Sequence, residues 1–273
     1  MRLAGAPISW GVCEVPGWGH QMAPGRVLAE MRALGLAATE LGPDGYLPAG
    51  LPAAHGLAVA GAFAPAVLHD PRRDPLPAIR RRLAALPPGA VLVLAAATGR
   101  DGYDARPALD AAAWAALLAN LDALRGRPVA LHPHVGTVVQ DAAEVRRVLD
   151  GCGVPLCLDT GHLLIGGTDP LDLARSDAGR IAHVHLKDVD AGAAARVRAG
   201  RVPYGEAVRA GLYRPLGAGD VDIAGIARAL TGAGYGGWYV MEQDTVLDAE
   251  PPPGGGPSAD VAAGLAYLAG ATP

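Results

Sequence analysis

The stretch AVLVLAA, residues 90–96, is apolar throughout and carries no charge. Further runs that are mainly apolar recur along the chain, at residues 3–9, 37–41, 58–63, 128–134, 155–162, 181–188 and 237–244. Near-continuous apolar strands are typical of a parallel sheet that is buried on both faces. These runs therefore predict eight parallel strands in an α/β fold.

Segments with the apolar spacing of a helix lie between the strand-like runs, at residues 24–34, 112–125, 141–151, 169–176 and 222–234. Several of them begin with Asp or Asp-Pro and end at Gly, which are start and stop signals for helices. Eight strand–helix units in 273 residues fit a (β/α)8 TIM barrel that forms a single domain over residues 1–273. An open, doubly wound sheet is the alternative.

One connection interrupts the repeat. Residues 189–221, between the seventh and eighth strands, are too long for a simple link. The pattern of VPYGEAVRAGLYRPLGAGDVD predicts a short helix followed by a loop. A long structured loop at this place is typical of a lid or a binding element.

Composition narrows the class of protein. The net charge is −4 and no basic run is present, which argues against a nucleic-acid or membrane-surface partner. The 3 cysteines have no paired spacing, and no apolar run has the length of a signal peptide or membrane span. We therefore expect a cytoplasmic protein with a small-molecule partner, and a homo-oligomer is compatible with the sequence.

Polar residues gather where the predicted strands end, which is where TIM barrels carry their active sites. The residues are Glu40, His132, His134, Asp159, His162, His183, His185, Lys187, Asp188, Glu242 and Asp244. Strand alternation places His132 with His134 on one face, and His183, His185 and Lys187 on another. Converging imidazoles and carboxylates suit a divalent metal such as Mn²⁺, Co²⁺ or Zn²⁺. The alternative is structural: a lone His can simply be hydrogen-bonded, Asp188 can cap the following loop, and Glu40 can support the strands.

Several motifs carry a family resemblance along essentially the whole chain. They are API-x-W (6–10), TELG (39–42), HPHVGTVVQ (132–140), LDTGHLLIGGTDP (158–170), HVHLKDV (183–189), PLGAGDVD (215–222) and GYGGWYVMEQD (234–244). With these motifs the chain resembles the xylose-isomerase-like TIM-barrel superfamily of sugar isomerases and epimerases, and within it the inosose dehydratase branch. Pro133 and the PLGAGDVD stretch depart from the pattern of that branch.

The resemblance implies a metal held by residues from strands five to eight. Carried onto this chain, the ligands are His132, Asp159, His185 and Glu242, with His132 where most relatives of the superfamily have Glu. The metals expected are Mn²⁺ or Co²⁺, with Mg²⁺ or Zn²⁺ as alternatives. A neutral His in place of a carboxylate makes the site a stronger Lewis acid toward a bound ketone.

The resemblance also implies the reaction: a cyclic polyhydroxy ketone, an inosose, loses water through an enediolate, as in inositol catabolism. This is carbon–oxygen lyase chemistry in carbohydrate metabolism. We assign catalytic roles to Lys187, His134 and Glu242, with His134 or Glu242 near the proton that is removed and Lys187 as a donor to a substrate oxygen. We assign substrate contacts to Trp10, Glu14, Glu40, His162 and Lys187.

Lys187 is the only lysine among 23 basic residues. Its ammonium is compact and can exchange a proton, whereas a guanidinium remains charged. A surface lysine that is unique by chance is the alternative interpretation.

Other functions remain open at this level. A keto-sugar isomerase or epimerase uses the same enediolate, and a β-eliminating lyase acting on a 3-keto sugar or glycoside begins with the same proton loss. A zinc-dependent nuclease for abasic DNA needs more ligands and a basic surface, and a non-catalytic binding subunit needs no metal-dependent turnover.

Overall fold

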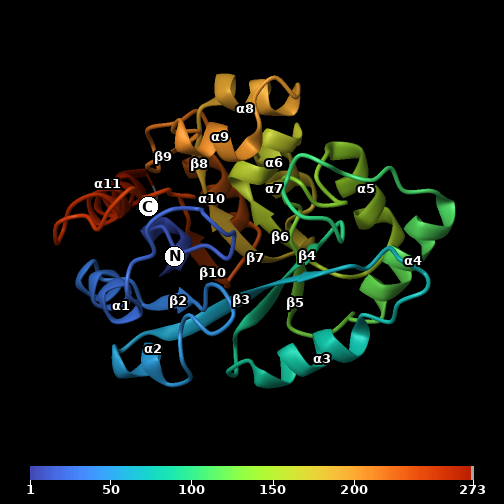
Figure 1. Cartoon of the computed structure of the whole chain (residues 1–273), viewed down its shortest axis with the longest axis horizontal. Coiled ribbons are helices and arrows are strands. Elements are labelled where there is room, and N and C mark those ends of the chain that lie inside the picture. Colours follow the sequence, from blue (N-terminus) through green and yellow to red (C-terminus); the bar gives the residue numbers. More distant parts are fainter. Residues whose placement is uncertain (272–273) are drawn as a thin grey trace.

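The apolar runs form eight parallel strands that close into a barrel in the computed structural model of the chain (Figure 1), which describes residues 1–271. The strands are β1 (Arg2–Gly5), β2 (Ala38–Glu40), β3 (Ala58–Ala66), β4 (Val91–Ala96), β5 (Val129–Leu131), β6 (Leu156–Asp159), β7 (Ile181–Leu186) and β10 (Trp238–Met241). Their order around the barrel is β1-β10-β7-β6-β5-β4-β3-β2, and β1 also pairs with β2 to close it. The predicted TIM barrel is confirmed, and the open-sheet alternative is wrong.

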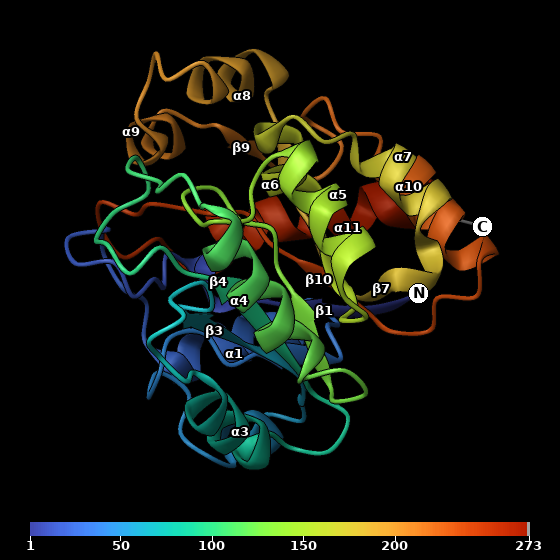
Figure 2. The same cartoon turned by 90° about the vertical axis from the view of Figure 1, so that its right-hand side faces the viewer.

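Helices cover the outside of the barrel (Figure 2). They are α1 (Pro24–Ala33), α2 (Leu51–Ala54), α3 (Leu76–Ala85), α4 (Ala111–Asp122), α5 (Ala142–Gly151), α6 (Thr160–Gly166), α7 (Pro170–Ser176), α8 (Ala191–Arg198), α9 (Tyr204–Arg209), α10 (Ile223–Gly232) and α11 (Pro257–Ala271). Two 3-10 helices, Pro7–Trp10 and Ala178–Arg180, complete the set. Within residues 1–271, none of the helices combines the length and apolar character needed to cross a membrane.

Aspartates begin several helices, as the sequence predicts. The side chains of Asp110, Asp141, Asp169 and Asp222 each accept a hydrogen bond from a backbone N–H in the first turn of α4, α5, α7 and α10. Each of these bonds satisfies an N–H that the helix itself leaves unpaired, which is worth about 1 kcal/mol per cap.

The sixth strand is shorter than the predicted run 155–162. It ends at Asp159, and α6 begins at the next residue, Thr160. The reason is local: Asp159 Oδ1 accepts a hydrogen bond from the backbone N–H of His162 at 2.8 Å and so caps the helix. Asp159 therefore lies at the end of the strand, and His162 lies on the helix that follows.

The long connection between β7 and β10, residues 189–221 (hereafter the insertion), differs from its prediction. It contains two helices, α8 and α9, where the sequence predicts one. A small antiparallel sheet joins β8 (Asp188–Val189) to β9 (Tyr213–Arg214) at its two ends. Figures 1 and 2 show α8 and α9 together at one edge of the molecule, next to α6.

Asp188 fixes the end of the insertion. It is 1% exposed, and its carboxylate accepts hydrogen bonds of 2.8–3.0 Å from four backbone N–H groups, those of Val189, Gly217, Gly219 and Val221. A Cβ at Gly219 would lie 2.3 Å from Asp188 Oδ1, so the loop can approach the carboxylate this closely only with glycine there. The capping role that the sequence left open for Asp188 is therefore the one it has.

Candidate active site

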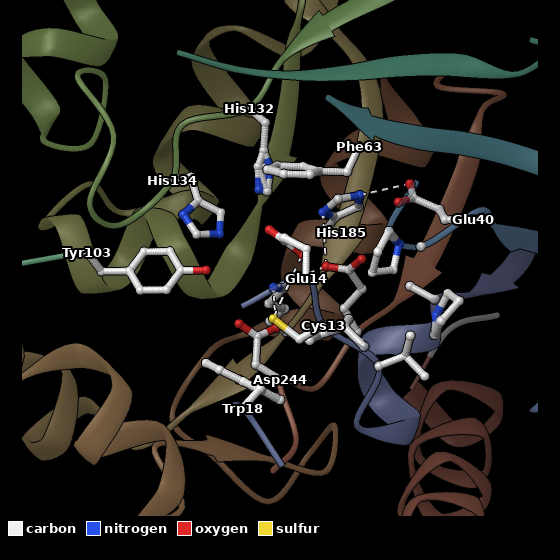
Figure 3. Close-up of a pocket in the computed structure, with 18 residues that line it drawn as sticks. Cys13, Glu14, Trp18, Glu40, Phe63, Tyr103, His132, His134, His185 and Asp244 are labelled. Atoms are coloured by element: carbon white, nitrogen blue, oxygen red, sulfur yellow. Dashed lines mark hydrogen bonds and ion pairs between the residues drawn. The ribbon is translucent and has the colours of Figure 1, made fainter. Parts of the chain in front are cut away.

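A cavity lies at the carboxyl ends of the barrel strands (Figure 3). Its lining residues come from the loops after β1 and β2 and from strand ends around the barrel: Ala6, Pro7, Ile8, Val12, Cys13, Glu14, Trp18, Glu40, Gly42, Pro43, Phe63, Tyr103, His132, His134, His185, Lys187, Glu242 and Asp244. Its volume of about 90 Å³ is several times what a single water molecule needs. The cavity therefore has room for a small ligand among many titratable groups.

Asp159, His185 and Glu242 converge on one side of this cavity. Each offers a ligand atom, and these atoms all lie within 4.8 Å of one another. His185 Nδ1 lies 3.3 Å from Asp159 Oδ2 and 3.1 Å from Glu242 Oε2. The register explains the convergence, because Asp159 of β6 pairs with His185 of β7, and Glu242 immediately follows β10, which is the next strand around the barrel.

His132 completes the group from the end of β5. It is 2% exposed, and both of its ring nitrogens are buried without a hydrogen-bond partner, although Nε2 lies 3.5 Å from Asp159 Oδ2. Burial, together with the charge of His185, lowers the pKa of His132 well below its usual value, so the ring is neutral. Unpaired buried nitrogens cost free energy. A neutral imidazole beside two carboxylates and a second imidazole fits the ligand set of a divalent metal.

Glu40 lies on the other side of His185. Its Oε1 is 3.0 Å from His185 Nε2 and 2.7 Å from His183 Nε2. Burial opposes the charged form of Glu40, but His185 and His183 outweigh it and lower the pKa of this carboxyl group. Gly61 makes room for the pair, because a Cβ there would lie 3.0 Å from Glu40 Oε1 and 2.9 Å from Val91 O. Glu40 lines the cavity as a side chain that orients His185 (Figure 3).

Lys187 is buried in the cavity wall with only 3% of its surface exposed. Its Nζ donates to Asp244 Oδ1 at 2.6 Å and lies 3.1 Å from Glu242 Oε2 and 3.2 Å from His162 Nε2. Burial opposes the ammonium, but Asp244, Glu242 and Asp159 outweigh it and raise the pKa of Lys187 well above its usual value. Lys187 is therefore a charged donor, and it is not a chance surface residue.

His134 is a neutral group in the cavity wall, and its ring centroid lies 3.7 Å from that of His162, the neighbour of Lys187. Its Nδ1–H donates to Val135 O at 2.7 Å, which leaves Nε2 with a lone pair. Burial and the nearby ammonium of Lys187 lower the pKa of His134 to about 4. The aromatic ring of Tyr103 stacks on it with the centroids 5.7 Å apart, and Figure 3 shows both rings on the same side of the cavity.

Glu242 differs from the other carboxyl groups. Burial, with the charges of Glu40 and Asp159, raises its pKa to about 7 against the opposing effect of His185 and Lys187. A carboxyl group with this pKa can exchange a proton near neutral pH.

Two tryptophans after β1, Trp10 and Trp18, have different environments. Trp18 lines the cavity and donates through Nε1 to Thr245 O at 2.9 Å. Trp10 does not line it: the side chain is 0% exposed, and its Nε1 donates to Glu30 Oε2 at 2.8 Å. The expected contact of Trp10 is therefore corrected, because an indole held by a carboxylate within the core presents no face to a ligand. Glu14 does line the cavity, whereas His162 lies behind Lys187.

Sequence reasoning missed four aromatic residues of the site and its surroundings: Phe63 and Tyr103 in the cavity wall, and Tyr204 and Tyr213 from the insertion. Asp244 was recognised as a polar strand end without a role. Its position two residues after Glu242 was the available signal, since both side chains then leave the strand on one side. No comparable spacing relates the aromatic residues to the site, because Phe63 lies in an apolar stretch of β3, and Tyr103, Tyr204 and Tyr213 lie in connections between barrel strands.

Comparison with known proteins gives one consistent result. A family model described as "Xylose isomerase-like TIM barrel" matches residues 76–269. The rhizopine catabolism protein MocC of Rhizobium meliloti is 33% identical over 267 residues, covering 89% of this chain and 82% of that protein. An inosose dehydratase of Geobacillus thermodenitrificans (strain NG80-2) is 29% identical over 267 residues, covering 89% of this chain and 90% of the relative.

Solved structures share the fold at lower identity. The IOLI protein, described with a binding zinc atom, has a TM-score of 0.60 at 16% identity, with 90% of each chain covered. The probable 3-DHS dehydratase AsbF from Bacillus anthracis has a TM-score of 0.65 at 15% identity, covering 98% of this chain and 99% of its own.

Proposed function

Because this chain belongs to the xylose isomerase-like TIM-barrel family, we propose that it is a carbon–oxygen lyase that dehydrates a cyclic polyhydroxy ketone of the inosose type with a bound divalent metal. Relatives named inosose dehydratase, aligned over about nine-tenths of both chains, support the reaction class. The substrate is a small cyclitol or keto sugar. The fold neighbours include epimerases as well as a probable dehydratase, so the assignment to a lyase relies on the relatives and on the site itself.

One observation carries the metal dependence: Asp159, His185 and Glu242 converge, and His132 beside them has two buried nitrogens without a partner. These four residues are the proposed ligands. When bound there, a divalent ion supplies Lewis-acid chemistry that polarises the ketone and acidifies the neighbouring C–H. The mixed nitrogen and oxygen set favours Mn²⁺ or Co²⁺, with Mg²⁺ or Zn²⁺ as alternatives.

The side chains around the ligands divide the proton transfers. Lys187 is held as an ammonium with Nζ 3.1 Å from Glu242 Oε2, so it donates to a substrate oxygen bound beside that carboxylate. The base is one of two groups. His134 keeps a free Nε2 lone pair at neutral pH, and Glu242 presents a carboxylate to the same cavity.

The cavity walls also protect the reaction. Ile8, Val12, Trp18 and Phe63 give the cavity apolar sides that limit access of water. Exclusion of water strengthens the interactions of Lys187 and Glu242 with a bound substrate and slows side reactions of an enolate.

The experiment that tests the proposal combines metal analysis of the purified protein with an assay of scyllo-inosose dehydration, followed by NMR in D₂O. We expect bound metal, turnover that is lost with a chelator and restored by Mn²⁺ or Co²⁺, and a dehydrated product. A deuterated isomer of the substrate without dehydration would assign the protein to the epimerases. Turnover that does not depend on metal would refute the ligand assignment.

Two variants identify the base. His134→Gln removes the basic imidazole nitrogen and leaves the four proposed ligands in place, so it should abolish most turnover while metal affinity is retained. His132→Gln is the matched control, because it removes a ligand and should lower metal affinity as well as turnover. If His134→Gln is fully active, the base is Glu242.

A further inference from the structure

The insertion contributes two buried tyrosines to the surroundings of Lys187. Tyr204 belongs to α9 and is 2% exposed, and Tyr213 belongs to β9 and is 4% exposed. Their hydroxyl groups lie 2.9 Å apart. Tyr204 also donates to Asp244 Oδ2 at 2.8 Å, and the Tyr213 hydroxyl lies 3.4 Å from His162 Nδ1. With the bonds from Lys187 to Asp244 and His162, these contacts close a five-residue hydrogen-bonded cycle of Lys187, Asp244, Tyr204, Tyr213 and His162.

The direction of each bond follows from Asp244. Its carboxylate is paired with an ammonium and only accepts hydrogen bonds. Tyr204 must therefore give its one hydroxyl proton to Asp244 Oδ2 and accept from Tyr213. Tyr213 has then used its own proton, so it must accept from His162 Nδ1–H.

The same arrangement follows independently from Lys187. An ammonium has donors and no acceptor, so His162 Nε2, 3.2 Å from Nζ, must carry a lone pair. A neutral imidazole with a lone pair on Nε2 has its proton on Nδ1, where Tyr213 accepts it. Both routes give one tautomer for His162, and each bond in the cycle then has one donor and one acceptor.

The cycle matters because Lys187 has two competing sets of partners. On one side are Glu242 and Asp159, whose oxygens lie 3.1 and 3.6 Å from Nζ and are proposed metal ligands. On the other side are Asp244 and His162, which belong to the cycle. Bonds of the second set hold the ammonium beside the proposed ligands.

We propose that Tyr204 and Tyr213 are positioning residues through which the insertion fixes Lys187 for its reaction; this inference rests on the proposed donor role of Lys187. Neither tyrosine lines the cavity, so both act through Asp244 and His162. The insertion is then part of the catalytic apparatus as well as a cover for one side of the barrel.

The unique lysine gives a direct test. Protein labelled with ¹⁵N at lysine Nζ contains a single labelled side chain, so NMR reports only Lys187. We expect a signal from an ordered ammonium whose protons exchange slowly with water, and several-fold faster exchange in Tyr204→Phe and in Tyr213→Phe. Tyr239→Phe is the matched control, because Tyr239 is 1% exposed and its hydroxyl lies 3.2 Å from Thr231 Oγ1, outside the cycle. Equal exchange in all three variants and the wild type would overturn the proposal.

The tautomer of His162 is measured in the wild-type protein, and a variant serves only to assign its signals. In ¹⁵N-labelled protein loaded with diamagnetic Zn²⁺, its ring should show a proton on Nδ1 and a bare Nε2, with the assignment made by comparison with His162→Asn. A proton on Nε2 would contradict the direction of the cycle and overturn the proposal.

Kinetics supply the third measurement. Each cycle variant should lower kcat by roughly tenfold or more while KM changes by less than about threefold, since a misplaced donor impairs the reaction more than binding. The double variant should lose little beyond either single one, because both break the same cycle. An effect no larger than that of Tyr239→Phe would overturn the proposal.

If the protein has no lyase activity, the two NMR measurements still decide whether the cycle holds Lys187, so failure of the function and failure of the inference are distinguishable.

Discussion

Replacing Lys187 with Arg preserves the charge at the centre of the site and removes a side chain that can give up a proton. In the wild type, Nζ has three partners within 2.6–3.2 Å, namely Asp244, Glu242 and His162. A guanidinium is planar, spreads its charge over three nitrogens and remains protonated at any ordinary pH. Lys187→Arg therefore keeps an ion pair with Asp244 and keeps N–H donors, but loses the group that can give up a proton.

The size of the expected effect comes from the role of that donor. General acid catalysis contributes about 10²- to 10⁴-fold, so kcat should fall at least about a hundredfold, or about 2.7 kcal/mol in the activation barrier. The free energy of unfolding should change much less, because the buried carboxylates keep a cation. Lys187→Met is the contrasting variant: it leaves the buried carboxylate of Asp244 without its cation and should destabilise the fold by about 3–5 kcal/mol.

The assay is the initial rate of dehydration of scyllo-inosose, with thermal unfolding and metal titration as controls for fold and ligands. If Lys187→Arg retains turnover within about tenfold of the wild type, Lys187 supplies only charge and its role as a proton donor is refuted. A variant that has lost its metal would instead indicate that the larger head group displaced Glu242.

Three further changes test other parts of the structure. Glu40→Gln should lower the free energy of unfolding at pH 7 by about 3–5 kcal/mol. Because the pKa of Glu40 is lowered from 4.5, the stabilisation is present above that pH and is lost in acid. In denaturant unfolding, the difference in free energy between wild type and variant should therefore shrink toward low pH, and a difference that grows would contradict the ion pair. Gly166→Ala places a Cβ 2.2 Å from Gln140 O and should lower the free energy of unfolding by more than about 2 kcal/mol. Gly179→Ala is the control, because no atom lies within 4 Å of the added Cβ, and it should be close to neutral. Equal melting temperatures of the two variants would disprove the clash. Burial raises the pKa of Cys13 from 9.0 to about 12, so alkylation at pH 8 should be about a thousandfold slower than for a free thiol. The alkylation rate, measured by mass spectrometry, should rise about tenfold per pH unit up to about pH 10. A rate that levels off near pH 9 would contradict the raised pKa.

Much of the fold was predictable because it depends on short-range patterns. Apolar runs such as 90–96 are long enough to identify a strand, and aspartates such as Asp141 identify the start of a helix. The end of β6 was predicted less well. The run 155–162 reads as continuous strand, and only the hydrogen bond from His162 N–H to Asp159 Oδ1 shows that a helix starts inside it.

The candidate site was predictable where its residues leave strands, because barrel geometry brings those ends together. His132, Asp159, His185 and Glu242 were found in this way, and their role as ligands stays a prediction. Residues from loops were not predictable. Trp10 and Trp18 lie in one Gly- and Trp-rich segment, and nothing in their spacing indicates that Trp10 packs in the core while Trp18 lines the cavity.

Gly61 has a consequence for how this barrel can change. A Cβ there would meet Glu40 Oε1 at 3.0 Å, Val91 O at 2.9 Å and His183 Cε1 at 3.4 Å, so the carboxylate and the imidazole occupy the volume that a larger residue would fill. Overfilling such a volume costs about 1–3 kcal/mol, and removing the polar pair while glycine remains leaves a hole. Because Val91 O belongs to the backbone, position 61 requires glycine whichever residues stand at 40 and 183, whereas substitutions at positions 40 and 183, whose side chains are 2.7 Å apart, are epistatic with each other. In a library randomised at all three positions, active clones should keep Gly61 and carry matched combinations at positions 40 and 183, where a single change that fails alone should be rescued by a second.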